Sequence, residues 1–238
     1  MPVIPGTDIN VSDTPLRRVI RRGSTMHNGR FASRKMGRTI PWESSNELAF
    51  LTLAELDADI ISIRAQPIEF QWRSASGFRR HVPDFAVMRG PKLEIHEVKP
   101  LAAALKPDVR EAAAWAERHC RDRGAVYGLA LAETLKAEPV FTNARTVLRR
   151  LHDRLDETLA IGTVEHIRER GTVPLGELTD WMARWGGTAF DVMTLAAHNR
   201  IALDLTRPLG RDGLVWPVQG FPRHPRALPL ATSVSLLP

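Results

Sequence analysis

Residues His81–Pro100, with the sequence HVPDFAVMRGPKLEIHEVKP, contain two apolar segments separated by the turn sequence RGP. Such a pattern predicts two neighbouring antiparallel strands. Three charged residues, Asp84, Glu97 and Lys99, stand where core strands usually carry apolar, β-branched side chains. Side chains two positions apart on a strand point to the same face, so Glu97 and Lys99 share one, and the hairpin brings Asp84 beside Glu97. The stretch therefore predicts a sheet that carries a charged cluster.

Two facing carboxylates repel each other in a partly buried site, so this cluster predicts a bound cation. Asp84, Glu97 and the backbone carbonyl of Val98, together with water, match the oxygen ligands that Mg²⁺ prefers, and Mn²⁺ is the expected substitute. Lys99 then lies near a metal-bound water or near the phosphate of a phosphodiester substrate. There it can position or activate the water as a nucleophile. The alternative is a structural cluster in which Lys99 forms salt bridges with both acids at a sheet edge.

Pro83-Asp84, twelve intervening residues and then Glu97-Val98-Lys99 form the signature of PD-(D/E)XK nucleases. A helix is predicted before these strands, from about Ser45 to Leu56, because Ser44 and Glu47 have the spacing of a capping box. Glu47 is the predicted third carboxylate of the site and an additional metal ligand. Glu43 competes for this role, although its place before the helix suits an interaction with the helix dipole equally well.

The composition is that of a globular protein, with 43% hydrophobic and 25% charged residues. No apolar run approaches the roughly 20 residues of a membrane helix, and the first residues lack the pattern of a signal peptide. A single cysteine, Cys120, excludes an internal disulfide framework and a cysteine-based zinc site. We expect a cytoplasmic protein without membrane contact.

The net charge of +6 favours a polyanionic partner, and the positive charge is concentrated near the N-terminus. Eight basic residues and no acidic ones lie between Thr14 and Trp42. This distribution predicts a flexible basic arm over residues 1–40 that contacts the DNA backbone. Two arginines just before the charged strand pair are further candidates for phosphate contacts. The predicted DNA-contacting residues are Arg17, Arg18, Arg21, Arg22, Arg30, Arg34, Lys35, Arg38, Arg79 and Arg80.

The periodicity along residues 41–153 predicts a helix, four strands, a helix, a strand and a helix, which is a mixed α/β domain. One of these strands is predicted as FRRHVPDFAVM (78–88), with Pro83 causing a bulge or an irregular entry. Residues 154–220 read as three short helices followed by a hairpin, the order of a winged helix, which binds either DNA or protein. The Pro-rich tail, residues 221–238, is predicted to be disordered or to bind a partner.

Several segments resemble the TnsA endonuclease family, over about residues 30–218. They are SRKMGRTIPWESSNELAFLTLAELDADIISIRAQPIEFQW (33–72), the VPDF and EVKP strands, and LAAHNRIALDLTRPLGRDGLVWPV (195–218). The resemblance implies a restriction-endonuclease-like PD-(D/E)XK core with a mixed sheet, followed by a small winged-helix domain. It also implies that Glu47, Asp84, Glu97 and Lys99 are the catalytic set.

Members of the TnsA family form one subunit of a heteromeric cut-and-paste transposase. The resemblance implies double-stranded DNA at transposon ends as the substrate, with the DDE-type transposase TnsB and the AAA+ ATPase TnsC as partners. We therefore expect a Mg²⁺-dependent endonuclease that cuts the 5′ strand at transposon ends, hydrolysing a phosphodiester with a metal-bound water. Two alternatives stay open: a free-standing nuclease of phage or restriction type, and a non-catalytic DNA-binding assembly module.

Overall fold

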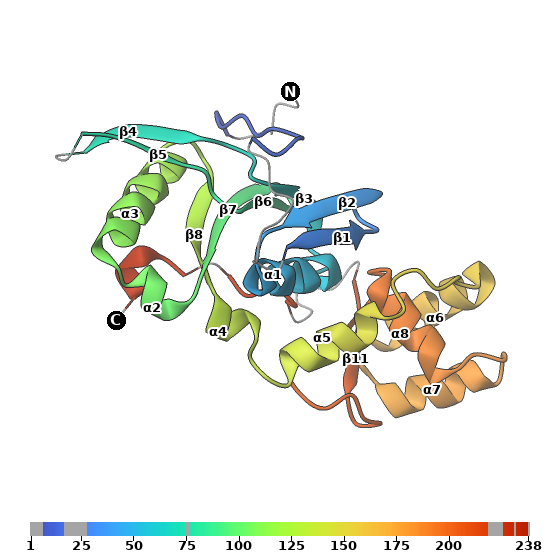
Figure 1. Cartoon of the computed structure of the whole chain (residues 1–238). Helices are drawn as coiled ribbons and strands as arrows, with labels where there is room; N and C mark the ends of the chain where they lie inside the picture. Colours follow the sequence, from blue (N-terminus) through green and yellow to red (C-terminus); the bar gives the residue numbers. More distant parts are fainter. Residues whose placement is uncertain (1–6, 17–27, 75–76, 219–225, 231, 238) are drawn as a thin grey trace. The chain divides into compact units, whose positions relative to one another are not determined.

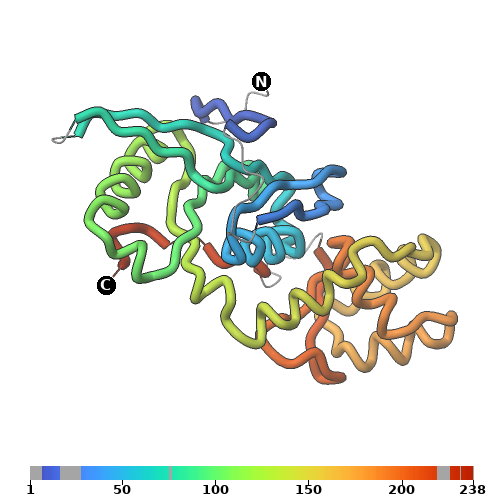
Figure 2. Tube along the Cα trace, in the orientation of Figure 1, coloured from blue at the N-terminus to red at the C-terminus, as the bar shows by residue number. Residues whose placement is uncertain are grey.

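The computed structural model describes residues 7–16, 28–74, 77–218, 226–230 and 232–237 (Figures 1 and 2). The chain divides into two compact units. Unit 1 takes in residues 1–51, 59–135 and 229–238, and unit 2 takes in residues 52–58 and 136–228. The sequence pattern puts the boundary near residue 153. The structure places it after Leu135, because the helix α5 (Val140–Leu148) packs on α8 (Ala189–Ala197) within unit 2.

Unit 1 is built on a four-stranded mixed sheet with the order β3-β6-β7-β8. Its strands are β3 (Ile60–Ala65), β6 (Phe85–Arg89), β7 (Lys92–Lys99) and β8 (Val126–Leu131). The predicted strand pair is β6 and β7, which run antiparallel in the register Phe85↔His96, whereas β7 and β8 are parallel. The mixed sheet expected from the sequence is therefore present, and β7 is one of its two inner strands.

The two faces of β7 pack against different helices. Leu93 and Ile95 join a hydrophobic core with the helix α3 (Pro107–Arg121). His96 points the other way, toward α1 (Ser45–Leu56), where the Phe50 ring lies 5.0 Å from it and stacks on Phe85 at 4.7 Å. Each fully buried phenylalanine contributes about 2 kcal/mol. This packing holds the end of β7 between α1 and α3. The short helices α2 (Leu101–Ala104) and α4 (Ala132–Leu135) follow β7 and β8.

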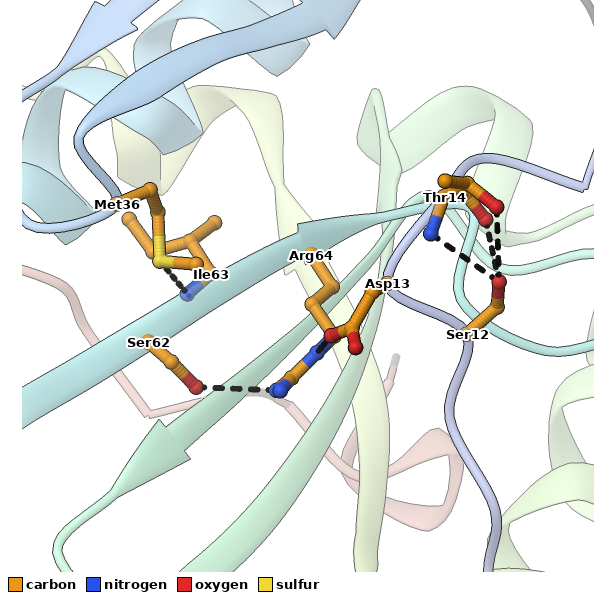
Figure 3. A network of polar contacts seen from close by, with 7 residues as sticks. All are labelled: Ser12, Asp13, Thr14, Met36, Ser62, Ile63 and Arg64. Atoms are coloured by element: carbon orange, nitrogen blue, oxygen red, sulfur yellow. Dashed lines mark hydrogen bonds and ion pairs between the residues drawn. The ribbon is translucent and has the colours of Figure 1, made fainter. Parts of the chain in front are cut away.

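The prediction of a flexible arm over residues 1–40 is wrong from residue 29 onward. There the chain forms a hairpin of β1 (Gly29–Ser33) and β2 (Arg38–Trp42). Gly37, with φ +59°, allows the tight turn between the strands. The turn is attached to β3 by two hydrogen bonds. Lys35 Nζ donates to the Ile60 carbonyl at 2.7 Å. Met36 Sδ accepts from the Ile63 amide at 3.2 Å (Figure 3). Arg17, Arg18, Arg21 and Arg22 lie outside the described residues.

A segment near the N-terminus also contacts β3. Asp13 accepts a hydrogen bond from Arg64 Nε at 2.8 Å, and Arg64 Nη1 also donates to Ser62 (Figure 3). Ser12 and Thr14 hydrogen-bond to each other on either side of Asp13. Arg64 lowers the pKa of the Asp13 carboxyl through the hydrogen bond and its charge. Because Asp13 is exposed, the pair orders this segment and adds little stability.

The strand predicted over residues 78–88 is two strands. Phe78 to His81 belong to β5 (Gly77–His81), which pairs with β4 (Phe70–Ser74) in a separate two-stranded sheet (Figure 1). The chain leaves this sheet at Val82 and enters the four-stranded sheet at Phe85 as β6. Pro83 explains the break, since it has no amide hydrogen to continue a ladder. Asp84 is thereby placed at the junction of the two sheets.

Unit 2 contains the three predicted helices and the predicted hairpin. The helices are α6 (Glu157–Arg170), α7 (Leu175–Ala183) and α8, and the hairpin is β10 (Ile201–Leu203) with β11 (Leu214–Pro217). A short strand absent from the prediction, β9 (Val173–Pro174), pairs with β11 and gives the order β10-β11-β9. Asp156 caps α6, and Thr188 forms a capping box with Asp191 at the start of α8.

The prediction that the tail is disordered is wrong for its described residues, which pack on their own chain, while partner binding stays a prediction. Thr232 exchanges two backbone hydrogen bonds with Leu129 on the edge strand β8. Val234, in the short helix η1 (Val234–Leu236), and Leu237 are buried in the core beside α3. The apolar end of the tail thus covers apolar surface and a free sheet edge. Among the described residues, none of the helices combines the length and the apolar character needed to cross a membrane.

Candidate functional site

Asp84, at the junction before β6, lies beside Glu97 and Lys99 at the end of β7. Asp84 Oδ2 accepts a hydrogen bond from the Val98 amide at 2.8 Å, and the Asp84 carbonyl accepts one from the Gln66 amide at 2.8 Å. Asp84 and Glu97 are each 6% exposed. The Asp84 side chain is therefore fixed against the segment Glu97–Lys99, as the antiparallel pair predicts.

Glu97 is held from two sides. Lys99 Nζ lies 2.5 Å from Glu97 Oε1, and His81 Nε2 lies 3.5 Å from Glu97 Oε2. The same His81 nitrogen lies 3.2 Å from the hydroxyl of Tyr127 on β8. Neither His81 nor Tyr127 is among the residues predicted for the site. The sequence signal was weak, since His81 ends a strand that seemed to continue through Pro83.

Glu47 lies in the first turn of α1, and Ser44 accepts its amide hydrogen as the predicted capping box requires, but the Glu47 carboxylate accepts from the Glu43 amide in place of the Ser44 amide. Its Oε2 accepts from the Glu43 amide at 2.9 Å, and its own amide donates to Ser44 Oγ at 3.1 Å. Burial and the negative charge of Asp84 raise the pKa of Glu47 to about 7. Glu47 is thus close enough to Asp84 for their charges to interact strongly, while it also stabilises the start of the helix.

Glu43, the competing carboxylate, accepts a hydrogen bond from Gln66 Nε2 at 3.3 Å. Gln66 is 2% exposed and has a φ of +45°, a backbone conformation that residues other than glycine rarely adopt. The backbone amide of Gln66 donates to the Asp84 carbonyl, so Gln66 connects the Glu43 side chain with the backbone of Asp84. Both carboxylates of this helix start lie at the site, and it is the charge of Glu47 that interacts with Asp84.

A groove of about 300 Å³ opens beside Glu97 and Lys99. The hairpin β4–β5 lines one side with Trp72, Arg79 and Arg80, and α3 lines the other with Asp108 and Glu111. His81 and Tyr127 form part of its wall. The groove is therefore lined by both cationic side chains, including Lys99, and carboxylates.

The segment that builds this site, residues 57–131, matches the family model described as TnsA-like endonuclease N terminal. This segment is similar to TnsA-like endonucleases. The match runs through all four strands of the mixed sheet and includes Asp84, Glu97 and Lys99. Glu47 and the helices of unit 2 lie outside it. A search of curated proteins found no match to the chain.

This finding confirms the resemblance drawn from the sequence. The match supports a nuclease related to those of Tn7 transposition. The mixed α/β architecture of unit 1 is compatible with a nuclease core.

Lys99 remains a cation in the TnsA-like domain. Burial by itself would lower its pKa, but the charges of Glu97 and Asp84 outweigh burial and raise the pKa above its ordinary value. Glu47 acts on Lys99 in the same direction. A protonated amine donates hydrogen bonds and accepts none. Lys99 is therefore suited to bind a phosphate oxygen and unsuited to remove a proton from water.

The donor chemistry of the site fits a hard divalent cation. Glu47, Asp84 and Glu97 are three buried carboxylates with one ammonium among them, and burial, followed by the negative charge of Asp84, raises the pKa of Glu47. Carboxylate oxygens are the ligands that Mg²⁺ prefers. Within the part of the chain that the structure describes, however, no three Asp, Glu, His or Cys side chains are arranged to hold a metal ion. Lys99 supplies the charge opposite Glu97 in this arrangement.

The predicted DNA-contacting residues that the structure describes fall into two groups. Arg79 and Arg80 line the groove, and Arg80 Nη1 lies 3.9 Å from Glu69. Arg30, Arg34 and Arg38 are exposed on the β1–β2 hairpin. Lys35 differs, because its ammonium bonds to a backbone carbonyl of β3 and so anchors the hairpin. We therefore retain the arginines as candidates for DNA contact and assign Lys35 a structural role.

We expect the free energy of unfolding to decrease as the pH rises from about 5 to 8 in the presence of EDTA. Glu47 has a pKa of about 7 in the folded chain against 4.5 ordinarily, so the folded state binds this proton more tightly. Its contribution is present below the ordinary pKa and lost as the pH rises to about 7, by up to about 3 kcal/mol. Glu47→Gln should remove most of this dependence. Urea denaturation of both proteins across this range measures it, and equal slopes would contradict the assignment.

Proposed function

We propose that the chain is the Mg²⁺-dependent endonuclease subunit of a TnsA-like transposase and cuts the 5′ strand at transposon ends. The observation that carries the proposal is the hydrogen bond from the Val98 amide to Asp84. It joins the Asp84 carboxylate to the segment Glu97–Lys99 within the part of the chain that matches the endonuclease model. The groove beside these residues provides the path for a DNA strand.

Each residue of the site has a separate proposed role. Asp84, Glu97, the Val98 carbonyl and Glu47 would hold the divalent cation, which would stabilise the negative charge that develops on the phosphate oxygens. Lys99 donates a hydrogen bond to a non-bridging oxygen of the attacked phosphate and opposes its charge. Lys99 holds Glu97 through their ion pair, and His81, which pairs with the Tyr127 hydroxyl, lies 3.5 Å from the other carboxylate oxygen of Glu97. Water attacks phosphorus and releases a proton to solvent, while the bond from phosphorus to the oxygen of the departing strand breaks and that oxygen takes up a proton from solvent.

Residues 154–220 are proposed to form a winged helix. The order α6, β9, α7, α8, β10, β11 and the sheet order β10-β11-β9 support this, with the wing between β10 and β11. The helix α8 contains no Lys or Arg, and Phe190 in its first turn is 63% exposed. This composition favours a protein surface over a DNA groove as the target of α8. TnsB and TnsC are the proposed protein partners.

Partner dependence tests the proposal against a free-standing nuclease. We expect the chain alone, with Mg²⁺, to leave a transposon-end duplex almost uncut, and the addition of TnsB-type and TnsC-type proteins to start cutting of the 5′ strand. Gel analysis of end-labelled DNA measures this. Rapid cutting by the chain alone would instead support a free-standing enzyme.

The ion pair between Lys99 and Glu97 favours a second candidate, a DNA-binding assembly module that binds no metal. Metal binding separates the two. We expect Mg²⁺ or Mn²⁺ at millimolar concentration, well above its Kd, to raise the melting temperature by about 3–8 °C, because a ligand that binds only the folded state stabilises it. Glu47→Gln should reduce this shift and Asp84→Asn should abolish it. A melting temperature that is indifferent to both ions would favour the assembly module.

A further inference from the structure

The hairpin β4–β5 has two chemically different faces. The register pairs Trp72 with Arg79 and Arg73 with Phe78, and paired residues of an antiparallel ladder point to the same face. The inner face packs on α3: the rings of Trp72 and Trp115 stack at 5.0 Å, and the Phe70 ring meets Trp115 edge-on at 5.8 Å. This packing holds the two-stranded ribbon on α3 as a rigid element (Figure 1).

The outer face carries an exposed aromatic ring among arginines. Phe78 is 63% exposed and lies directly across from the exposed Arg73. The next pair on the same face is Gln71 and Arg80, and the Arg80 side chain is 66% exposed. Glu69 is an acidic side chain near this pair: its Oε1 accepts a hydrogen bond from Gln71 Nε2 and lies 3.9 Å from Arg80. Arginine contacts phosphates and guanine, and an apolar ring contacts the thymine methyl group. The combination is therefore that of a DNA-reading surface.

The ribbon is connected directly to the proposed cutting site. β5 ends at His81, whose Nε2 lies 3.5 Å from Glu97 Oε2. Phe78 precedes His81 by three residues of extended strand, which span about 10 Å. Because base pairs are stacked about 3.4 Å apart, this length corresponds to about three base pairs. A two-stranded β-ribbon also has dimensions that the major groove admits.

We propose that the outer face of the β4–β5 ribbon, with Arg73, Phe78 and Arg80, lies in the major groove of duplex DNA about three base pairs from the cut phosphate. The position relative to the cut rests on the proposed function, whereas DNA binding by the ribbon does not. Arg73 and Arg80 contact phosphates or base edges at the groove, and the Phe78 ring contacts the base edges between them. The ribbon thereby sets the register of the DNA in the site.

DNA affinity tests the binding surface. In an Asp84→Asn background, which prevents cutting, the full chain is titrated onto a fluorescent mixed-sequence duplex of about 30 base pairs. We expect Arg73→Ala combined with Phe78→Ala to weaken binding at least about tenfold, and Arg73→Ala alone to reduce the salt dependence by about one counterion. Ile61→Ala, at a site 62% exposed, and Lys92→Ala, at the opposite end of β7 from Lys99, are the matched controls and should bind normally. Equal affinity of the double variant and the controls, with circular dichroism showing the fold intact, would overturn the proposal.

A second measurement tests the position. Phe78→Cys, labelled with a chelated iron that cleaves nearby DNA, is assembled with its transposase partners on transposon-end DNA. We expect iron-dependent cleavage centred about three base pairs from the enzymatic cut. Cleavage more than a helical turn away would overturn the assigned register. The two proposals fail separately: if Asp84→Asn still cuts, the catalytic assignment is wrong, and the affinity of the ribbon variants still decides whether the ribbon binds DNA.

Discussion

Replacing Asp84 with asparagine should reduce cutting of the 5′ strand in the complete transposase by at least about a thousandfold, or about 4 kcal/mol of transition-state stabilisation. Asparagine keeps an oxygen that accepts from the Val98 amide, so the link between Asp84 and β7 survives. The substitution removes the negative charge of Asp84, which would bind a divalent cation and contributes to the electrostatic potential of the site. The rate of 5′-strand cutting with saturating Mg²⁺ measures the effect.

Asp84→Ala serves as the companion variant. It should be equally inactive, but it also leaves the buried Val98 amide without its acceptor, which costs about 1–3 kcal/mol of stability. Urea denaturation therefore separates the two changes, with the asparagine variant closer to the unmodified protein. Near-normal cutting by Asp84→Asn would contradict the catalytic assignment, whatever its stability.

Replacing Lys99 with alanine should reduce cutting by at least about a hundredfold, because the phosphate loses a charged hydrogen-bond donor. The variant also leaves Glu97 without the ammonium at 2.5 Å, among the carboxylates of Asp84 and Glu47. In EDTA we expect the free energy of unfolding to fall by about 2 kcal/mol, less than for a fully buried pair because a third of the Lys99 side chain is exposed. Mg²⁺ should restore much of this stability without restoring cutting.

Two control variants make the Lys99 result specific. Lys92→Ala removes a lysine at the other end of the same strand and should leave both cutting and stability close to normal. Lys99→Arg keeps the positive charge and should retain stability in EDTA, while its larger head group disturbs the contact with phosphate. Cutting by Lys99→Ala at the normal rate would contradict the proposed role of the ammonium.

The central strand pair and its charged residues were predictable because the periodicity along residues 81–100 is strong and the turn between the strands is short. The register needed to bring Asp84 to β7 follows from the same pattern. The start of α1 was equally predictable, since the capping box is a local interaction between Ser44 and Glu47. Local signals of this kind do not depend on the rest of the chain.

The features that the sequence pattern missed depend on distant contacts. The split at Pro83 separates β5 from β6 because β5 pairs with β4, a choice made by tertiary packing against Trp115. His81 enters the site only through that split. The hairpin β1–β2 was hidden by its basic residues, whose charge suggested a flexible arm. The tail becomes ordered because it covers the edge of β8, and no local signal marks an edge strand.

The most direct test of the central claim is strand-specific mapping of transposon-end DNA cut by the assembled transposase, with either unmodified chain or its Asp84→Asn variant. The account predicts that the unmodified assembly produces both cuts. With the variant, the 5′-strand product disappears, while the 3′-strand product made by the partner transposase remains. A 5′-strand product of normal yield from the variant assembly would contradict the claim that this chain cuts that strand with the site built on Asp84, Glu97 and Lys99.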